Sequence, residues 1–134
     1  MATSTVPEDL VQDLKKAREK LGKLKVPDIE EIRQLKKPHP LVVKVLESVL
    51  ILTGRERCCE ESCWDDALRF MDDPNFLKTV IEFTPEQVDP QAIPKLASSM
   101  SDPKFNSEAV SRVSLVCDYL VQWVHAVYNI RNAS

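Results

Sequence analysis

The feature that most constrains the fold of this 134-residue chain is a narrow apolar stripe near its beginning. Lysine, arginine, glutamate and aspartate fill most positions between the apolar residues. The apolar residues recur at alternating intervals of four and three, the spacing of a coiled-coil seam: Leu10, Leu14, Ala17, Leu21 and Leu24. A stripe this narrow is not buried by its own helix, so the sequence requires a partner helix.

A second apolar stripe near the end of the chain is the natural partner. Its residues repeat at intervals of three and four: Val113, Val116, Leu120, Val124 and Val127. We predict one helix here that starts with Asn106 or Ser107 as its N-cap and runs to about Arg131. Antiparallel pairing of the first and last helices covers both stripes, and the residues between them then form a knob on a short rod.

Prolines interrupt the first stripe. Proline cannot donate a hydrogen bond to the preceding turn and restricts the residue before it, so the helix is predicted to break near residues 26–27 and to resume with a shifted phase. A second cluster of prolines then ends the helical pattern. We predict three prolines as hinge positions: Pro27, Pro38 and Pro40.

The segment between the two stripes is predicted to form short helices. Residues 41–53 are apolar on nearly all sides, as in a central buried helix, and Gly54 is its expected C-terminal cap. Further helices are expected from Ser62 or Cys63, after Asp73-Pro74, from Thr84-Pro85 and over 89–100. With 2 glycines, 9 prolines and no alternating strand pattern, the chain is predicted to be all-α: a small helical bundle at the end of a short antiparallel coiled coil.

The sequence argues against a metal site, a disulfide framework and a secretory or membrane-spanning segment. Cys58, Cys59 and Cys63 are too close together and lack a nearby histidine for structural zinc, and Cys117 belongs to the last apolar stripe. No apolar run is long enough to span a bilayer. Residues 1–7 lack the apolar core of a signal peptide and are interpreted as a polar leader or an added end. Four cysteines in such a chain do not make a disulfide framework, which favours a reducing, cytoplasmic location.

Catalysis is not expected. His39 lies between two prolines, and His125 lies in the last stripe without a nucleophile or carboxylate beside it in sequence. Adjacent acids such as Asp65-Asp66 point about 100° apart on a helix, so capping and solvation explain them better. A glycine-rich phosphate loop is absent from the sequence. We therefore predict no catalytic residue, no cofactor and no metal.

Charge is distributed unevenly. Residues 15–37 contain nine basic and four acidic residues, whereas residues 56–89 contain ten acidic and three basic residues. Such asymmetry steers partners more than it shapes a fold. The basic residues lie outside a heptad seam, and no aromatic residue precedes Arg57, so a solvated coiled-coil flank is favoured over a nucleic-acid site.

The ordered set of features resembles the stalk tip of dynein heavy chains over roughly residues 20–130. Residues 24–29 and 32–38 are similar to the end of the first stalk helix, and residues 42–54 to the first tip helix. Trp64, Asn75-Phe76-Leu77, Val80-Ile81 and Phe83 fit the next pattern. The last tip helix and the returning stalk helix are matched by Asp102-Pro103, Phe105-Asn106, Glu108, Val110, Arg112, Ser114-Leu115, Cys117 and Trp123.

This resemblance implies a non-catalytic module that docks in the groove between α- and β-tubulin, with an affinity set by the register of two stalk helices. It implies residues 8–37 as the first stalk helix, 38–116 as the tip, and 117–134 as the last tip helix continuing into the returning stalk helix. The implied partners are tubulin and the rest of an AAA+ ATPase heavy chain, with no nucleic acid and no membrane. The alternative is a coiled-coil-capped module that binds another protein.

The resemblance also implies a tubulin-facing surface. Its expected residues are Lys36, Lys37, Lys44, Glu108 and Arg112. Two basic positions of cytoplasmic dyneins align with Val43 and Asp73, and both changes weaken the expected attraction to acidic tubulin. They favour an axonemal or otherwise divergent heavy chain, located on the cytoskeleton of a cilium or flagellum.

Overall fold

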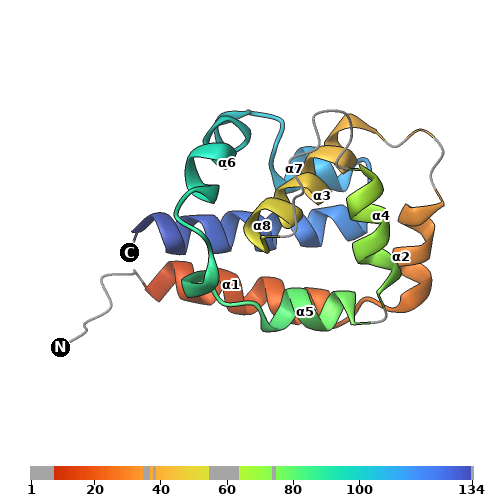
Figure 1. Ribbon diagram of the computed structural model, residues 1–134, viewed down its shortest axis with the longest axis horizontal. Coiled ribbons are helices and arrows are strands. Elements are labelled where there is room, and N and C mark those ends of the chain that lie inside the picture. Colours follow the sequence, from red (N-terminus) through yellow and green to blue (C-terminus); the bar gives the residue numbers. More distant parts are fainter. Residues whose placement is uncertain (1–7, 35–36, 38, 55–63, 74, 134) are drawn as a thin grey trace.

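The computed structural model describes residues 8–34, 37, 39–54, 64–73 and 75–133, and these residues form helices without a strand (Figure 1). The helices in chain order are α1 (Glu8–Leu21), α2 (Val26–Arg33), α3 (Pro40–Leu52), α4 (Trp64–Asp72), α5 (Phe76–Glu82), the 3₁₀ turn η1 (Pro85–Gln87), α6 (Ala92–Ser101), α7 (Ser107–Ser111) and α8 (Leu115–Ala133). The all-α prediction is confirmed. Within the described residues, no helix combines the length and the apolar character needed to cross a membrane.

The pairing of the first and last helices is confirmed. Figure 1 shows α1 and α8 side by side and antiparallel, so that α1 begins and α8 ends at the same end of the molecule. Three residues of the predicted seam are buried on α1: Leu14, Ala17 and Leu21. Leu120, Val124 and Val127 are buried on α8. Each fully buried leucine or valine stabilises the fold by roughly 1.5–3 kcal/mol, so this seam holds the two ends of the chain together.

Helix α8 is also the centre of the bundle. Besides α1, it contacts α3, α6, α7 and η1. The side chains of Cys117, Val121 and Trp123 are fully buried on it. Helix α3 is buried on several sides, as its nearly continuous apolar sequence predicts. It ends at Leu52, and Gly54 two residues later has a φ of 72°, the left-handed conformation expected of a glycine just after a helix.

The predicted break in the first stripe lies between α1 and α2. Helix α1 ends at Leu21, and the turn that follows it is held by hydrogen bonds such as Lys23 N to Lys20 O at 3.1 Å. Asp28 then accepts a hydrogen bond from the backbone N–H of Lys25 at 2.8 Å. Pro27 therefore lies in the first turn of α2, where a missing N–H is harmless, and starts a new helix.

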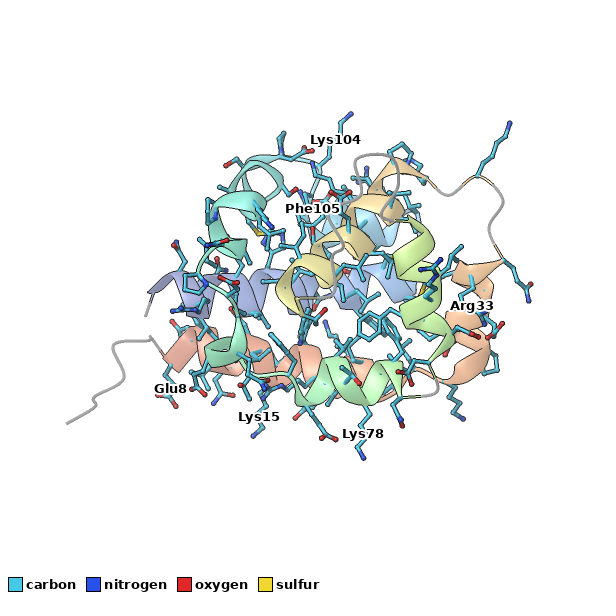
Figure 2. All side chains as sticks on the ribbon, in the orientation of Figure 1. Glu8, Lys15, Arg33, Lys78, Lys104 and Phe105 are labelled. Carbon is cyan, nitrogen blue, oxygen red and sulfur yellow. The ribbon has the colours of Figure 1, made fainter. Side chains whose placement is uncertain are left out.

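An arginine holds α2 against the next part of the bundle. Arg33 at the end of α2 pairs with Glu30 on its own helix and, at 2.9 Å, with Asp72 at the end of α4. Figure 2 shows Arg33 lying where α2 faces α4. The bridge connects the ends of α2 and α4, and α2 leaves the line of α1 beside α4 (Figure 1).

The prediction of one continuous final helix was wrong. The chain forms α7, leaves the helix at Arg112–Ser114, and begins α8 at Leu115. The Ser114 hydroxyl accepts a hydrogen bond from the Cys117 N–H at 3.2 Å, so serine starts a new helix instead of continuing the old one. Val113 is consequently 38% exposed and does not belong to the buried seam. The predicted cap at Asn106 is confirmed, because its side chain accepts the Ala109 N–H at 2.8 Å.

The short middle helices lie close to the predicted positions, but their bounds differ from the predicted ones. The predicted start at Ser62 or Cys63 lies outside the described residues, and α4 is described from Trp64. Thr84-Pro85 begins only the short turn η1, where Gln87 accepts the Thr84 N–H at 3.0 Å. Helix α6 starts at Ala92, three residues later than expected, because Asp89 binds the Gln91 N–H at 2.9 Å and closes a turn first.

Replacing Leu21 by alanine tests the importance of the α1–α8 seam. Leu21 is fully buried, so the variant is expected to lose about 2–5 kcal/mol of unfolding free energy through lost burial and the cavity it leaves. The measurement is urea unfolding followed by circular dichroism. Val11 on the same helix is 47% exposed, and the matched Val11→Ala variant is expected to change stability by less than about 0.5 kcal/mol. Equal losses in both variants would contradict the seam.

Candidate functional site

Glu108 lies in the first turn of the short helix α7, and Arg112 is the residue that directly follows this helix. The Arg112 Nη2 donates to Glu108 Oε1 at 3.1 Å, and the two side chains are 76% and 83% exposed. An ion pair this exposed contributes only about 0.5 kcal/mol to the fold. Both groups are therefore accessible to a partner at little cost to the domain.

The turn between α7 and α8 shares a groove with the connection between α2 and α3. The groove has a volume of about 540 Å³. Lys37 and His39 line it from the connection, and Val113, Ser114 and Leu115 line it from the turn. The structure thus brings predicted residue Lys37 to the segment that directly follows Arg112. Lys36 and Pro38 lie outside the described residues.

Lys44 has a partner that the sequence did not reveal. Its ammonium donates to Asp102 Oδ2 at 2.6 Å and lies 5.6 Å from the centre of the Phe105 ring. The hydrogen bond from Lys44, followed by one from the Lys104 N–H, lowers the pKa of the Asp102 carboxyl group. Asp102 is therefore ionised at neutral pH and forms an ion pair with Lys44. Figure 2 shows Phe105, the ring beside Lys44, below the outward-pointing Lys104.

A polar network links α1 with α7 through α8. The Lys20 ammonium donates to Gln122 Oε1 at 2.8 Å. Gln122 Nε2 in turn donates to Asp118 Oδ1 at 3.0 Å and to Ser107 Oγ at 3.2 Å. The Ser107 hydroxyl also binds the buried Asp118 carboxylate. Ser107 is the first residue of α7, so the network connects the stalk-like helix α1 to the helix that carries Glu108 and Arg112.

Residues 7–132 match the family described as the microtubule-binding stalk of dynein motor. The chain belongs to this family. It is 36% identical over 100 residues to dynein axonemal heavy chain 6 of Homo sapiens, a match that covers 75% of this chain and 2% of the relative. Dynein axonemal heavy chain 2 of Homo sapiens is 30% identical over 120 residues, covering 90% of this chain and 3% of the relative. The solved microtubule-binding domain of dynein-C has a similar fold, with a TM-score of 0.82 at 24% identity, covering 94% of this chain and 87% of that one.

These comparisons confirm the dynein resemblance and its axonemal relatives. They favour microtubules over another protein partner, and membership in a stalk family agrees with the prediction of a binding module instead of an enzyme. This dynein stalk domain spans only 2% and 3% of the two human relatives. By their names, these and other relatives are axonemal or flagellar heavy chains.

Val43 and Asp73, which we predicted to align with basic residues of cytoplasmic dyneins, are half-buried. Val43 follows the buried Val42 on α3. Asp73 accepts a hydrogen bond from the Asn75 N–H at 2.8 Å, just before α5 begins. In this dynein stalk domain, position 73 therefore holds an acid that closes the turn into a helix.

Pro27 and Pro40, two of the three predicted hinge prolines, and both histidines have structural roles at helix starts or in hydrogen bonds. Pro27 lies in the first turn of α2, and Pro40 is the first residue of α3. His39 caps α3, because its Nδ1 accepts the Leu41 N–H at 3.1 Å. His125 Nε2 lies 2.7 Å from the Phe105 carbonyl oxygen. These contacts explain both histidines without catalysis.

The cysteines divide into two groups. Cys58, Cys59 and Cys63 lie outside the described residues, and the described part of the chain contains no cluster of three potential metal ligands. Cys117 is fully buried on α8, as its place in the apolar stripe predicts. Burial raises the pKa of the Cys117 thiol to about 11, because the thiolate would lose its hydration.

Cys117 is expected to resist alkylation in the folded protein. With its pKa near 11, the thiolate fraction at pH 8 is on the order of one in a thousand. Mass spectrometry of the Cys117 peptide after iodoacetamide treatment should show slow labelling in buffer and fast labelling in urea. The raised pKa also means that this thiol supports the fold at neutral pH and that the support is lost as pH rises from about 9 through 11. Equal labelling rates in both conditions would contradict this burial.

Proposed function

We propose that this domain binds microtubules through a tip surface at the end opposite its two termini, docking in the groove between α- and β-tubulin. The tip surface consists of Lys37, Glu108, Arg112, Val113 and Leu115, together with the adjacent Lys36. The observation that carries the proposal is the meeting of Lys37 with the α7–α8 turn in one groove, although these segments are far apart in sequence. Figure 1 shows α2 and the beginning of α8 at the end away from the termini.

Attraction at this surface is electrostatic in the proposal. Tubulin presents a strongly acidic surface, and Lys37 and Arg112 supply exposed positive charge. Charge complementarity of this kind accelerates association and weakens with salt. Lys44 contributes less than the sequence suggests, because Asp102 already neutralises it.

We further propose that the register of α1 against α8 sets the microtubule affinity. In this division, residues 8–37 form the first stalk helix and residues 38–116 form the tip. Residues 117–134 form the last tip helix continuing into the returning stalk helix, and Pro27, Pro38 and Pro40 act as hinges. A change in the register of α1 against α8 would alter the position of α7 through the hydrogen bonds that join Lys20, Gln122 and Ser107. The stalk helices would connect the tip to the ATPase ring of a heavy chain in a ciliary or flagellar axoneme, because the relatives include axonemal heavy chains.

Replacing Arg112 by alanine tests the proposed function. Microtubule affinity in a co-sedimentation assay is expected to fall about three- to tenfold at low salt, because an attractive charge at the interface is lost. The dependence on salt should also become shallower, since one fewer charge is screened. Lys15→Ala is the charge-matched control, because Lys15 points outward from α1 away from the tip surface (Figure 2). Identical pelleting of the Arg112 variant and the unmodified domain would contradict the assignment.

Replacing Asp102 by asparagine tests whether the ion pair with Asp102 keeps Lys44 from binding tubulin. The change removes a negative charge and releases the Lys44 ammonium, which now lies 2.6 Å from Asp102. Microtubule affinity is expected to rise by up to about fivefold, the range of a single exposed ion pair. Asp89→Asn removes the same charge near α6, away from the tip surface, and should leave the affinity unchanged. A rise in both variants would point to net charge alone, and no rise in the Asp102 variant would exclude Lys44 from the interface.

A further inference from the structure

Two large apolar side chains of the tip surface, Val113 and Leu115, are exposed to solvent instead of packed in the core. Among the described residues, the large apolar side chains with the greatest exposure are Val11, Val113 and Leu115. Val113 lies in the short turn between α7 and α8, and Leu115 directly follows that turn. Leu115 is 60% exposed, more than either of the others, although it is the first residue of the central helix of the bundle.

The groove beside this turn has an apolar floor. Ile32 of α2, Val42 of α3 and Val116 of α8 line the groove and are almost fully buried, so they form its base. Charged and polar side chains also line the groove: Lys37 and His39 from the connection between α2 and α3, and Asp28 and Glu31 from α2. With a volume of about 540 Å³, the groove has room for one or two protein side chains. An apolar group entering it would leave water and contact carbon on most sides.

We infer that Val113, Leu115 and this groove form an apolar contact that takes an apolar side chain of the tubulin surface. The inference rests on the proposed function and goes beyond its charge-based attraction. The contact is continuous with the proposed interface, because Val113 directly follows Arg112 and Lys37 lines the same groove. Acidic tubulin residues are attracted by Lys37 and repelled by Asp28 and Glu31, which also line the groove. The apolar side chain then contacts the buried apolar residues that line the groove, Ile32, Val42 and Val116.

The dependence of affinity on salt concentration distinguishes this apolar contact from attraction between charges. Salt screens the attraction of exposed charges such as Arg112 but does not weaken burial of apolar surface. Loss of Arg112 should therefore change the slope of affinity against salt concentration. Loss of Leu115 should lower affinity by the same factor at every salt concentration.

The test is microtubule co-sedimentation of Leu115→Ser over a salt series. We expect affinity to fall about five- to tenfold at each salt concentration with an unchanged slope, which is the scale of one apolar side chain buried at an interface. Val11→Ser is the matched control, since Val11 is an exposed apolar residue of α1. Leu115→Met keeps an apolar side chain and should bind like the unmodified domain. Thermal unfolding of each variant checks that the fold is intact.

The outcomes separate the inference from the proposed function. If Leu115→Ser binds like the unmodified domain while Arg112→Ala binds more weakly, the apolar contact is excluded and the charge-based interface stands. If Leu115→Ser changes the slope but Leu115→Met does so too, the effect lies in the turn and not in apolar burial, which also overturns the inference. If the unmodified domain fails to pellet with microtubules at low salt, both the function and the inference are wrong.

Discussion

Leu14, Ala17 and Leu21 of α1 are shielded from water because α8 lies against them, and α3 covers α8 from another side. Helix α8 therefore both forms the seam with α1 and occupies the centre of the bundle. Its side chains Trp123, Val124 and Val127 are fully buried. Removing α8 would expose the apolar faces of both α1 and α3, so the short helices around it depend on it more than on their own helix propensity.

Electrostatics has a different role inside the domain from the one it has at the tip surface. Several cations of the domain have partners within the chain and connect one helix or turn to another. These pairs are Arg18 with the Phe83 carbonyl, Lys20 with Gln122, Arg33 with Asp72, Lys44 with Asp102, and Arg131 with the Val88 carbonyl. The excess positive charge of residues 15–37 thus overstates the charge available to a partner. Exposed cations such as Lys37 and Arg112 therefore indicate the attraction to a partner better than the net charge of residues 15–37 does.

The sequence predicts those features whose cause is local. Apolar periodicity locates α1, α3 and α8, and the backbone needs of helix ends locate the caps at Asn106 and Gly54. The break at Ser114 escaped prediction because Val113 and Val116 keep the helical spacing across it, and only the serine side chain bonded to the Cys117 N–H ends the pattern. The Lys44–Asp102 pair escaped prediction for another reason. Its residues are 58 positions apart, and only packing of α3 against the segment before α7 brings them together.

The break at Arg112–Ser114 gives the proposed register mechanism a physical basis. If α7 and α8 were one helix, every movement of the seam would tilt the tip as a rigid rod. Because the helix is broken, α7 is positioned by its own contacts, including Ser107 bound to Asp118 and Gln122 on α8. A shift of α1 by one helical turn would move Lys20 about 5.4 Å along α8. That step exceeds the 2.8 Å hydrogen bond from Lys20 to Gln122, so Gln122 would have to find new partners at the base of α7. A seam with discrete steps can in this way alter the position of α7, and with it Arg112, while the core of α8 stays packed.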